Sequence, residues 1–156
     1  MTFMAESQFV YVTYIRTTAE KLWKALTEPE YTRQYWMGTT QECAWKPGDS
    51  WRILFADGRV ADTGEIVEIE PKRRMVLKWR HEIDAELREE GYSRLTYELE
   101  QTGESVKLSL VHVMNKLDSK FIKAVSTGWP MILSSLKSLL ETGEMLELTC
   151  PSPKGM

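Results

Sequence analysis

The sequence predicts an α+β fold in which a curved, seven-stranded antiparallel sheet wraps around a long C-terminal helix. Two short helices are expected after the first strand. Three observations predict this fold. An apolar stripe at helical spacing runs from about residue 119 to 141. Apolar and polar residues alternate between Thr39 and Met114, with turn signals between the alternating segments. One strand pattern and two helix patterns precede them.

The first strand is predicted at Phe9 to Ile15, where every residue is β-branched or aromatic. Thr17 and Glu20 then have the Thr-x-x-Glu spacing of a capping box, which predicts a helix over about 18–27. The same spacing recurs once more and predicts a second short helix over about 29–36.

Six further strands are predicted between tight turns such as Pro47-Gly48-Asp49 and Asp57-Gly58. Short strands joined by tight turns favour an antiparallel meander. The charged stretch from Glu82 to Gly91 is interpreted as a solvated loop or hairpin end, with a lid over a cavity as the alternative. The predicted strands are 39–45, 50–56, 61–70, 75–81, 92–101 and 105–113.

The alternation assigns one apolar and one polar face to the sheet. Apolar residues such as Leu77 and Trp79 share one parity, and polar residues take the other. Val10, Val12 and Ile66 are expected on the outer, wet face. His81 shares the parity of Trp79, but it ends its strand beside charged residues and is expected to be exposed.

The long C-terminal helix is predicted over about 119–141. Pro130 removes a backbone hydrogen bond and disfavours helical dihedrals at the preceding residue. A kink between Ser126 and Pro130, or a restart of the helix, is therefore expected. Gly143 is a candidate C-cap. The stripe consists of Phe121, Val125, Trp129, Ile132, Leu136, Leu139 and Leu140.

Composition excludes several functional classes. The chain has 156 residues and a net charge of −3, which is typical of one globular domain and not of a nucleic-acid binder. We expect a single domain over 1–156, with a core at about 8–142 and a frayed tail at 143–156.

Two cysteines and two histidines are too few for a zinc cluster or a disulfide framework, so we expect reduced thiols, no metal and no cofactor. No signal peptide or membrane-spanning segment is recognisable, so a cytoplasmic location is expected.

Several segments, in this order, resemble the activator-of-Hsp90-ATPase-homologue branch of the START-like (Bet v 1-like, SRPBCC) superfamily. The resemblance implies a helix-grip fold, and it implies no particular function because this fold hosts lipid carriers, polyketide cyclases and resistance proteins. Two departures, Asp49-Ser50 in place of a second glycine and Pro130 after Gly128-Trp129, lie where a cavity wall is expected. The matching segments are Ala19–Thr27 with Pro29, Gly48 with Trp51, Asp57-Gly58, Gly64–Pro71, Leu77–Trp79, and Gly128-Trp129 with Leu133, Leu136-Lys137 and Leu139-Leu140.

Large aromatic side chains, most of them tryptophans from different helices and strands, are predicted to converge between the sheet and the C-terminal helix. Such residues suit either a pocket for a flat or apolar ligand or a filled aromatic core. Met37, Met75, Met114 and Met131 are candidate adaptable walls or plain core residues. The candidate ligand-binding residues are Trp36, Trp51, Phe55, Trp79, Tyr97, Leu110, His112, Met114, Phe121, Val125, Trp129 and Leu133.

Three functions remain open from the sequence. The leading hypothesis is a protein that binds a small hydrophobic or aromatic molecule in an internal cavity. The second is a cavity enzyme, cyclase-like or hydrolase-like, with His112 as acid or base and Tyr97 as its polar partner. The bland alternative for His112 is a neutral core histidine. The third is a chaperone-cofactor-like interaction module, which rests on the resemblance alone. A homodimer is compatible with all three.

Overall fold

The computed structural model describes residues 6–147 and contains one seven-stranded antiparallel sheet and four helices within that range. The strands are β1 (Ser7–Ile15), β2 (Thr40–Glu42), β3 (Ser50–Leu54), β4 (Val60–Glu70), β5 (Arg74–His81), β6 (Ser93–Thr102) and β7 (Ser105–Met114). The helices are α1 (Ala19–Thr27), α2 (Pro29–Tyr35), α3 (Ala85–Glu89) and α4 (Lys120–Thr142).

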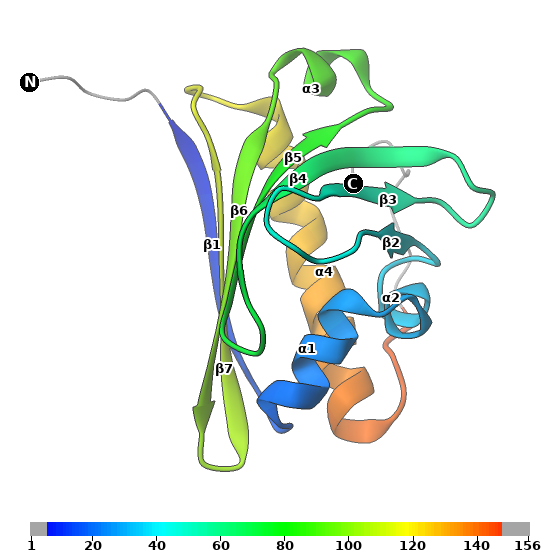
Figure 1. Cartoon of the computed structure of the whole chain (residues 1–156), viewed down its shortest axis with the longest axis vertical. Coiled ribbons are helices and arrows are strands. Elements are labelled where there is room, and N and C mark those ends of the chain that lie inside the picture. The colour runs from blue at the N-terminus through cyan, green and yellow to red at the C-terminus, as the bar shows by residue number, and fades with distance from the viewer. Residues whose placement is uncertain (1–5, 148–156) are drawn as a thin grey trace, which may run out of the picture.

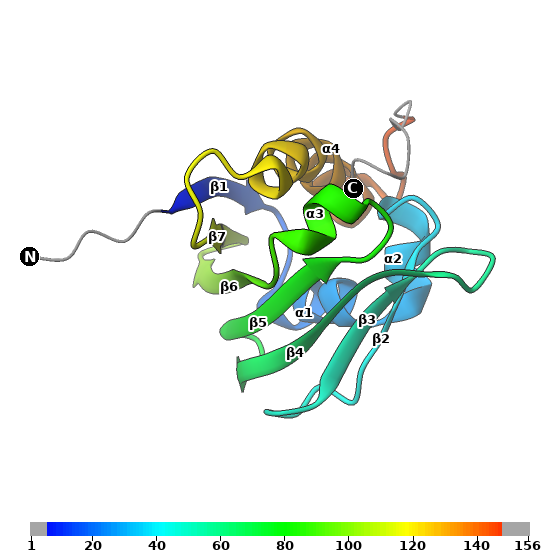
Figure 2. The same ribbon diagram turned by 90° about the horizontal axis from the view of Figure 1, so that it is seen from above.

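The strand order is β1-β7-β6-β5-β4-β3-β2, so β1 and β2 form the two edges of the sheet. Helices α1, α2 and α4 lie on the same, concave side of the curved sheet (Figures 1 and 2). The apolar stripe of α4 is buried against this face, with Phe121, Trp129 and Leu136 each at most 2 % exposed. The predicted helix-grip fold is therefore confirmed.

The charged stretch after β5 is not the plain loop that the sequence predicts. The side chain of Asp84 accepts a hydrogen bond from the backbone N–H of Glu86 and starts the short helix α3. Leu87 of this helix is buried, which fastens α3 to the core. The Asp84 cap and the buried Leu87 side chain therefore stabilise a helix in a segment whose charged composition predicts a loop.

Ile66 was expected on the outer face, and this prediction is wrong. The register between β4 and β5 shifts between Ile66 and Glu68, so one extra residue, Val67, is inserted there. Such a β-bulge reverses the alternation of faces. Ile66 is consequently buried before the bulge, and Ile69 packs against the core after it. Val10 and Val12 lie on the outer face as predicted, 52 % and 46 % exposed.

Helix α4 continues through Pro130, so the expected restart does not occur. Proline removes one main-chain hydrogen bond, but the buried residues on both sides of it, Trp129 and Ile132, hold the helix against the sheet. The helix ends at Gly143, which adopts a left-handed φ of +85° and donates its N–H to the carbonyl of Leu139 at 2.9 Å, as a C-cap does. Within residues 6–147, no helix is long and apolar enough to cross a membrane.

Candidate functional site

Four tryptophans and their neighbours form one cluster between the sheet and α4. Trp79 of β5 lies at its centre, with ring centroids 4.8 Å from Trp51 of β3 and 5.5 Å from Trp129 of α4. Trp36, directly after α2, lies 5.3 Å from Trp129. We call this set, completed by Tyr97, His112 and Phe121, the aromatic cluster.

The histidine of the cluster has a partner on each ring nitrogen. The indole N–H of Trp129 donates to Nδ1 of His112 at 3.1 Å. Because an indole nitrogen can only donate, the imidazole proton lies on Nε2, which contacts Oγ of Ser93 at 2.8 Å. The Ser93 hydroxyl in turn donates to the carbonyl of Trp79 at 2.8 Å. This chain fixes a neutral His112 in a single tautomer.

Burial makes both of the predicted acid–base groups inert near neutral pH. His112 is fully buried, and burial lowers its pKa from 6.5 to about 3. Burial also raises the pKa of the Tyr97 hydroxyl well above its ordinary value. As placed, His112 orients Trp129 and has no free nitrogen with which to exchange a proton with a ligand.

The sequence interpretation missed a second buried histidine, which is paired with an aspartate. His81, expected to be exposed, is fully buried, with Nδ1 3.2 Å from Oδ1 of Asp62. The same carboxylate oxygen accepts the indole N–H of Trp79 at 2.9 Å, and burial raises the pKa of Asp62. Residues 62 and 81 are direct partners in the β4–β5 register. The parity that His81 shares with Trp79 was the usable signal, and it outweighs the charged neighbours.

The structure brings most of the predicted lining residues into one core, but Phe55 is only partly buried and packs against the edge of that core. Strand β3 ends at Leu54, and Phe55 enters the following turn, half-buried beneath the Arg59 guanidinium at 5.0 Å. The other predicted lining residues outside the aromatic cluster are all buried: Leu110, Met114, Val125 and Leu133.

The aromatic cluster nearly fills the space in which a ligand cavity was predicted. What remains is a cavity of about 10 Å³, enough for about one water molecule. We call it the inner cavity. Its lining consists of Trp36, Trp79, Val125, Gly128, Trp129 and Ile132.

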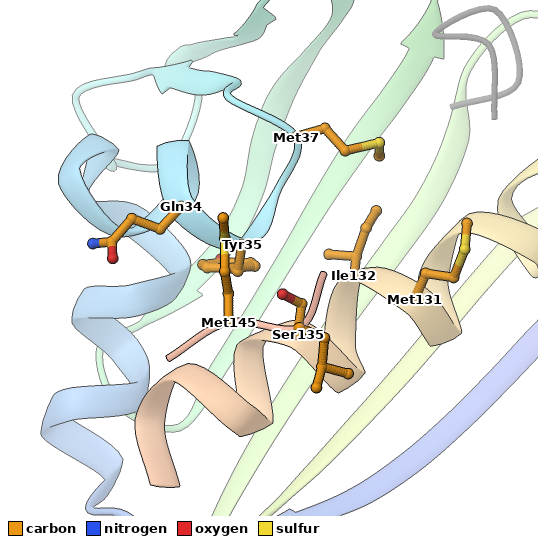
Figure 3. Close-up of a pocket in the computed structure, with 8 residues that line it drawn as sticks. Gln34, Tyr35, Met37, Met131, Ile132, Ser135 and Met145 are labelled. Carbon is orange, nitrogen blue, oxygen red and sulfur yellow. The ribbon is translucent and has the colours of Figure 1, made fainter. Parts of the chain in front are cut away.

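A larger cavity of about 90 Å³ lies between α2 and α4 (Figure 3). We call it the α2–α4 cavity. It has three methionines and no charged side chain among its lining residues, and Tyr35 is fixed there by a 2.7 Å hydrogen bond from its hydroxyl to the carbonyl of Ala25. The lining consists of Gln34, Tyr35, Met37, Met131, Ile132, Ser135, Met145 and Leu146.

The segment after α4 closes this cavity, although the sequence suggested a frayed tail from residue 143. Met145 and Leu146 are 49 % and 41 % exposed and still contribute to the lining. The hydroxyl groups of Ser138 and Thr142 donate to the carbonyl of Glu144 and hold the segment against the helix. Two apolar residues shortly after the C-cap glycine, separated from it only by Glu144, were the signal for this closure.

The described residues offer no alternative centre for a metal. No group of three or more His, Cys, Asp or Glu side chains is arranged for a metal ion in the part of the chain that the structure covers. Cys43 is a free thiol there, and Cys150 lies outside the described residues.

Residues 16–141 match the family model of the activator of Hsp90 ATPase homolog 1-like proteins. The chain belongs to this family. A comparison with curated protein sequences finds no match.

Three solved structures illustrate the shared fold. A protein from Mesorhizobium loti has a TM-score of 0.74 at 23 % identity, with 89 % of this chain and 100 % of that chain covered. The Aha1 dimer from Colwellia psychrerythraea has a TM-score of 0.71 at 18 % identity, covering 88 % and 98 %. An HSP90 activator from Plasmodium falciparum has a TM-score of 0.66 at 23 % identity, covering 85 % and 95 %. At these identities the likeness shows the fold alone.

The family match covers most of the residues described above. The match spans the aromatic cluster, α2 and most of α4. Met145 and Leu146 lie beyond residue 141, outside the span shared with the activator of Hsp90 ATPase homolog 1-like family.

Proposed function

We propose that this protein binds a small apolar molecule, or the apolar end of a larger one, in the α2–α4 cavity. The observation that carries the proposal is an apolar, methionine-rich cavity with its own closing segment, Met145-Leu146, at the side of a filled core. Apolar concave sites with few polar groups are the usual form of small-molecule sites.

The size of the cavity limits the ligand. Its volume of about 90 Å³ is smaller than the roughly 150 Å³ of an engineered cavity that holds benzene. It is also well below the roughly 300 Å³ at which drug-sized sites begin. A single ring therefore needs Met37, Met131 or Met145 to change conformation, which methionine does readily because its side chain is unbranched.

The cavity supports binding better than it supports the other two functions. A cyclase or hydrolase mechanism through His112 needs a free ring nitrogen, and both nitrogens have partners in the core. The Plasmodium falciparum protein is an HSP90 activator, but its 23 % identity carries no partner over to this chain. Ligand binding rests on the geometry of the chain itself.

The test uses methyl NMR on protein labelled at the methionine methyl groups, with benzene and indole as probes. We expect shifts at Met37, Met131 and Met145, and little change at Met75, which is buried in β5. The variant S135L places a larger side chain in the cavity and should abolish the shifts. The matched control T127L changes an exposed position of the same helix and should retain them. Absent shifts in the wild type, or full binding by S135L, would refute the proposal.

We infer a second binding surface, for another copy of this chain, on strand β1. Gln8 to Ile15 carries no charge and no proline, the features that usually protect an edge strand from pairing. Val10, Val12 and Tyr14 are 46–52 % exposed on its outer face. Antiparallel pairing of two β1 strands would place this apolar row against itself, as a two-fold interface requires. The structure of the Colwellia psychrerythraea Aha1 as a dimer supports the proposal.

Sedimentation velocity tests this surface. The wild type should sediment as a dimer at micromolar concentration, and V12K should sediment as a monomer because two lysines would face each other across the interface. T102K adds the same charge at an exposed position of β6 and should leave the dimer intact. A wild-type monomer, or an unchanged V12K dimer, would exclude β1 pairing.

A further inference from the structure

A buried hydroxyl group faces the α2–α4 cavity. Ser135 of α4 lies one helical turn after Met131 and Ile132, and all three residues line the cavity. Figure 3 shows the Ser135 hydroxyl pointing toward Tyr35 and Met145, which line the same cavity. Ser135 is only 4 % exposed, so its hydroxyl is turned to the cavity and not to the solvent.

The other two lining side chains that carry an oxygen or nitrogen atom already have partners. The amide nitrogen of Gln34 donates to the carbonyl of Glu30 at 2.9 Å, and Figure 3 shows this amide pointing away from Ser135. The Tyr35 hydroxyl donates to the carbonyl of Ala25 at 2.7 Å. The hydroxyl of Ser135 is therefore the polar side-chain group of the lining that a ligand can reach.

The Ser135 hydroxyl has no partner within its own helix. Serine and threonine in helices often donate to a carbonyl three or four residues earlier. Elsewhere in α4, Ser126 donates to the carbonyl of Lys123 at 2.7 Å, and Thr142 donates to that of Ser138 at 2.8 Å. Ser135 makes no such bond, and within residues 6–147 no other group is hydrogen-bonded to its hydroxyl. A buried hydroxyl without a partner is unfavourable, and a ligand that pairs with it removes this cost.

Four other buried polar atoms also have no partner among the described residues. They are Oε2 of Glu28, Nε1 of Trp36, Oδ2 of Asp62 and Nε2 of His81. None of these four residues lines the α2–α4 cavity. The position of Ser135 in the lining, and not the lack of a partner alone, is what points to a ligand.

Water is a poor partner for this hydroxyl. A buried water molecule typically makes about three hydrogen bonds to polar groups of the protein. Around Ser135 the lining consists largely of Ile132, Leu146 and the three methionine side chains, which offer no strong donor or acceptor. A molecule with an apolar body and one polar group matches this lining better, because its body contacts the methionines while its polar group pairs with the hydroxyl.

We propose that the Ser135 hydroxyl forms a hydrogen bond with the ligand and so selects a molecule with one polar group on a small apolar body. This inference rests on the proposed function. A hydroxyl can both donate and accept, so it pairs equally with a hydroxyl or a carbonyl group of the ligand. No charged side chain lines the cavity, so the polar group of the ligand is uncharged. The ligand class is a small neutral ring compound with one oxygen substituent, such as a phenol.

Two probes of nearly the same size isolate the hydrogen bond. Phenol carries a hydroxyl group where toluene carries a methyl group. Titrations followed by methionine methyl NMR give the affinity of each probe and hence the preference for phenol over toluene. S135A removes the hydroxyl and should lower this preference about fivefold, the usual size of one hydrogen bond. S134A makes the same change at the next residue of α4, which does not line the cavity, and should keep the wild-type preference.

Thermal unfolding without a ligand separates ligand recognition from a structural role. Because the Ser135 hydroxyl has no partner in the described chain, S135A should be at least as stable as the wild type, and alanine is also the better helix former. A lower stability of S135A would show that the hydroxyl is already paired inside the protein, and it would overturn this inference.

The outcomes also separate this inference from the proposed function. If both probes shift the methyl groups of Met37 and Met131 but S135A keeps the wild-type preference, then the role of Ser135 is wrong and the binding site stands. If neither probe shifts those methyl groups, the proposed function fails and this inference fails with it.

Discussion

The indole N–H of Trp129 donates to Nδ1 of His112, and this bond joins α4 to β7 across the core. It fixes the imidazole as a neutral acceptor on one side and a donor to Ser93 on the other. A protonated His112 would place an N–H against the N–H of Trp129. The contact is therefore compatible with the neutral histidine only, and it couples the stability of the fold to pH.

The first prediction is a loss of stability in acid that depends on His112. Burial lowers the pKa of His112 from 6.5 to about 3. Between these values the unfolded chain takes up a proton that the folded protein does not. The free energy of unfolding therefore falls as the pH drops from about 6.5 toward 3, by up to about 1.4 kcal/mol per pH unit. Urea unfolding between pH 7 and pH 4 measures this slope.

The variant H112Q is the matched comparison for that prediction. Glutamine can accept from Trp129 and donate to Ser93, but it does not titrate. Its stability should depend less steeply on pH than that of the wild type, because all other titratable groups are the same in the two proteins. Parallel curves for the two proteins would show that His112 is not the group responsible.

The second prediction contrasts two glycines. A Cβ on Gly64 of β4 would lie 1.7 Å from the carbonyl oxygen of Lys78, so the neighbouring strand would have to move. A Cβ on Gly128 of α4 meets no atom within 4 Å. G64A should therefore cost more than about 3 kcal/mol, and G128A should gain about 1 kcal/mol from improved helix propensity. Thermal unfolding of both variants decides it, and equal effects would contradict the close approach at Gly64.

The third prediction concerns the start of α4. The carboxylate of Glu90 accepts from the Ser119 hydroxyl at 2.5 Å and from the backbone N–H of Lys120 at 2.8 Å. It thus satisfies donors that every helix start leaves free and places negative charge at the positive end of the helix dipole. E90A should lower the free energy of unfolding by about 1–2 kcal/mol. E89A, which removes an exposed neighbour, should leave it nearly unchanged, and a similar loss in both would argue against the cap.

The sequence predicted the fold well because its signals are local and repeated. The capping spacing at Thr18–Lys21 is shifted by one residue from the one inferred at Thr17, yet the helix begins where the apolar pattern required. Alternation located the strands within a few residues. It failed at Ile66 because a single inserted residue reverses the faces, and nothing in the composition of Ile66-Val67-Glu68 marks that insertion.

The site was predicted less well, because space between side chains is not a property of the sequence. The sequence predicted that Trp36, Trp79 and Trp129 converge from different elements, and they do, but it could not tell whether three rings fill a volume or line it. The contact of Asp62 with His81 depends on the register between β4 and β5. The place of Met145 in the cavity lining depends on the direction that the chain takes after the C-cap of α4. Register and chain direction are both set by tertiary packing, which a single sequence does not specify.

The last prediction is that Ile132 separates the two cavities. Truncation in I132A should join them and admit a ring more easily, with α-methylstyrene binding at least fivefold more tightly than in the wild type. The same change should lower the free energy of unfolding by about 2–4 kcal/mol, because it removes a buried side chain. The control L139A truncates a partly buried residue of α4 that lines neither cavity, and it should leave the affinity unchanged. Methionine methyl NMR measures the affinity in each protein. An I132A protein that binds no better than the wild type would show that the spaces around Trp36 and Met131 do not communicate through this side chain.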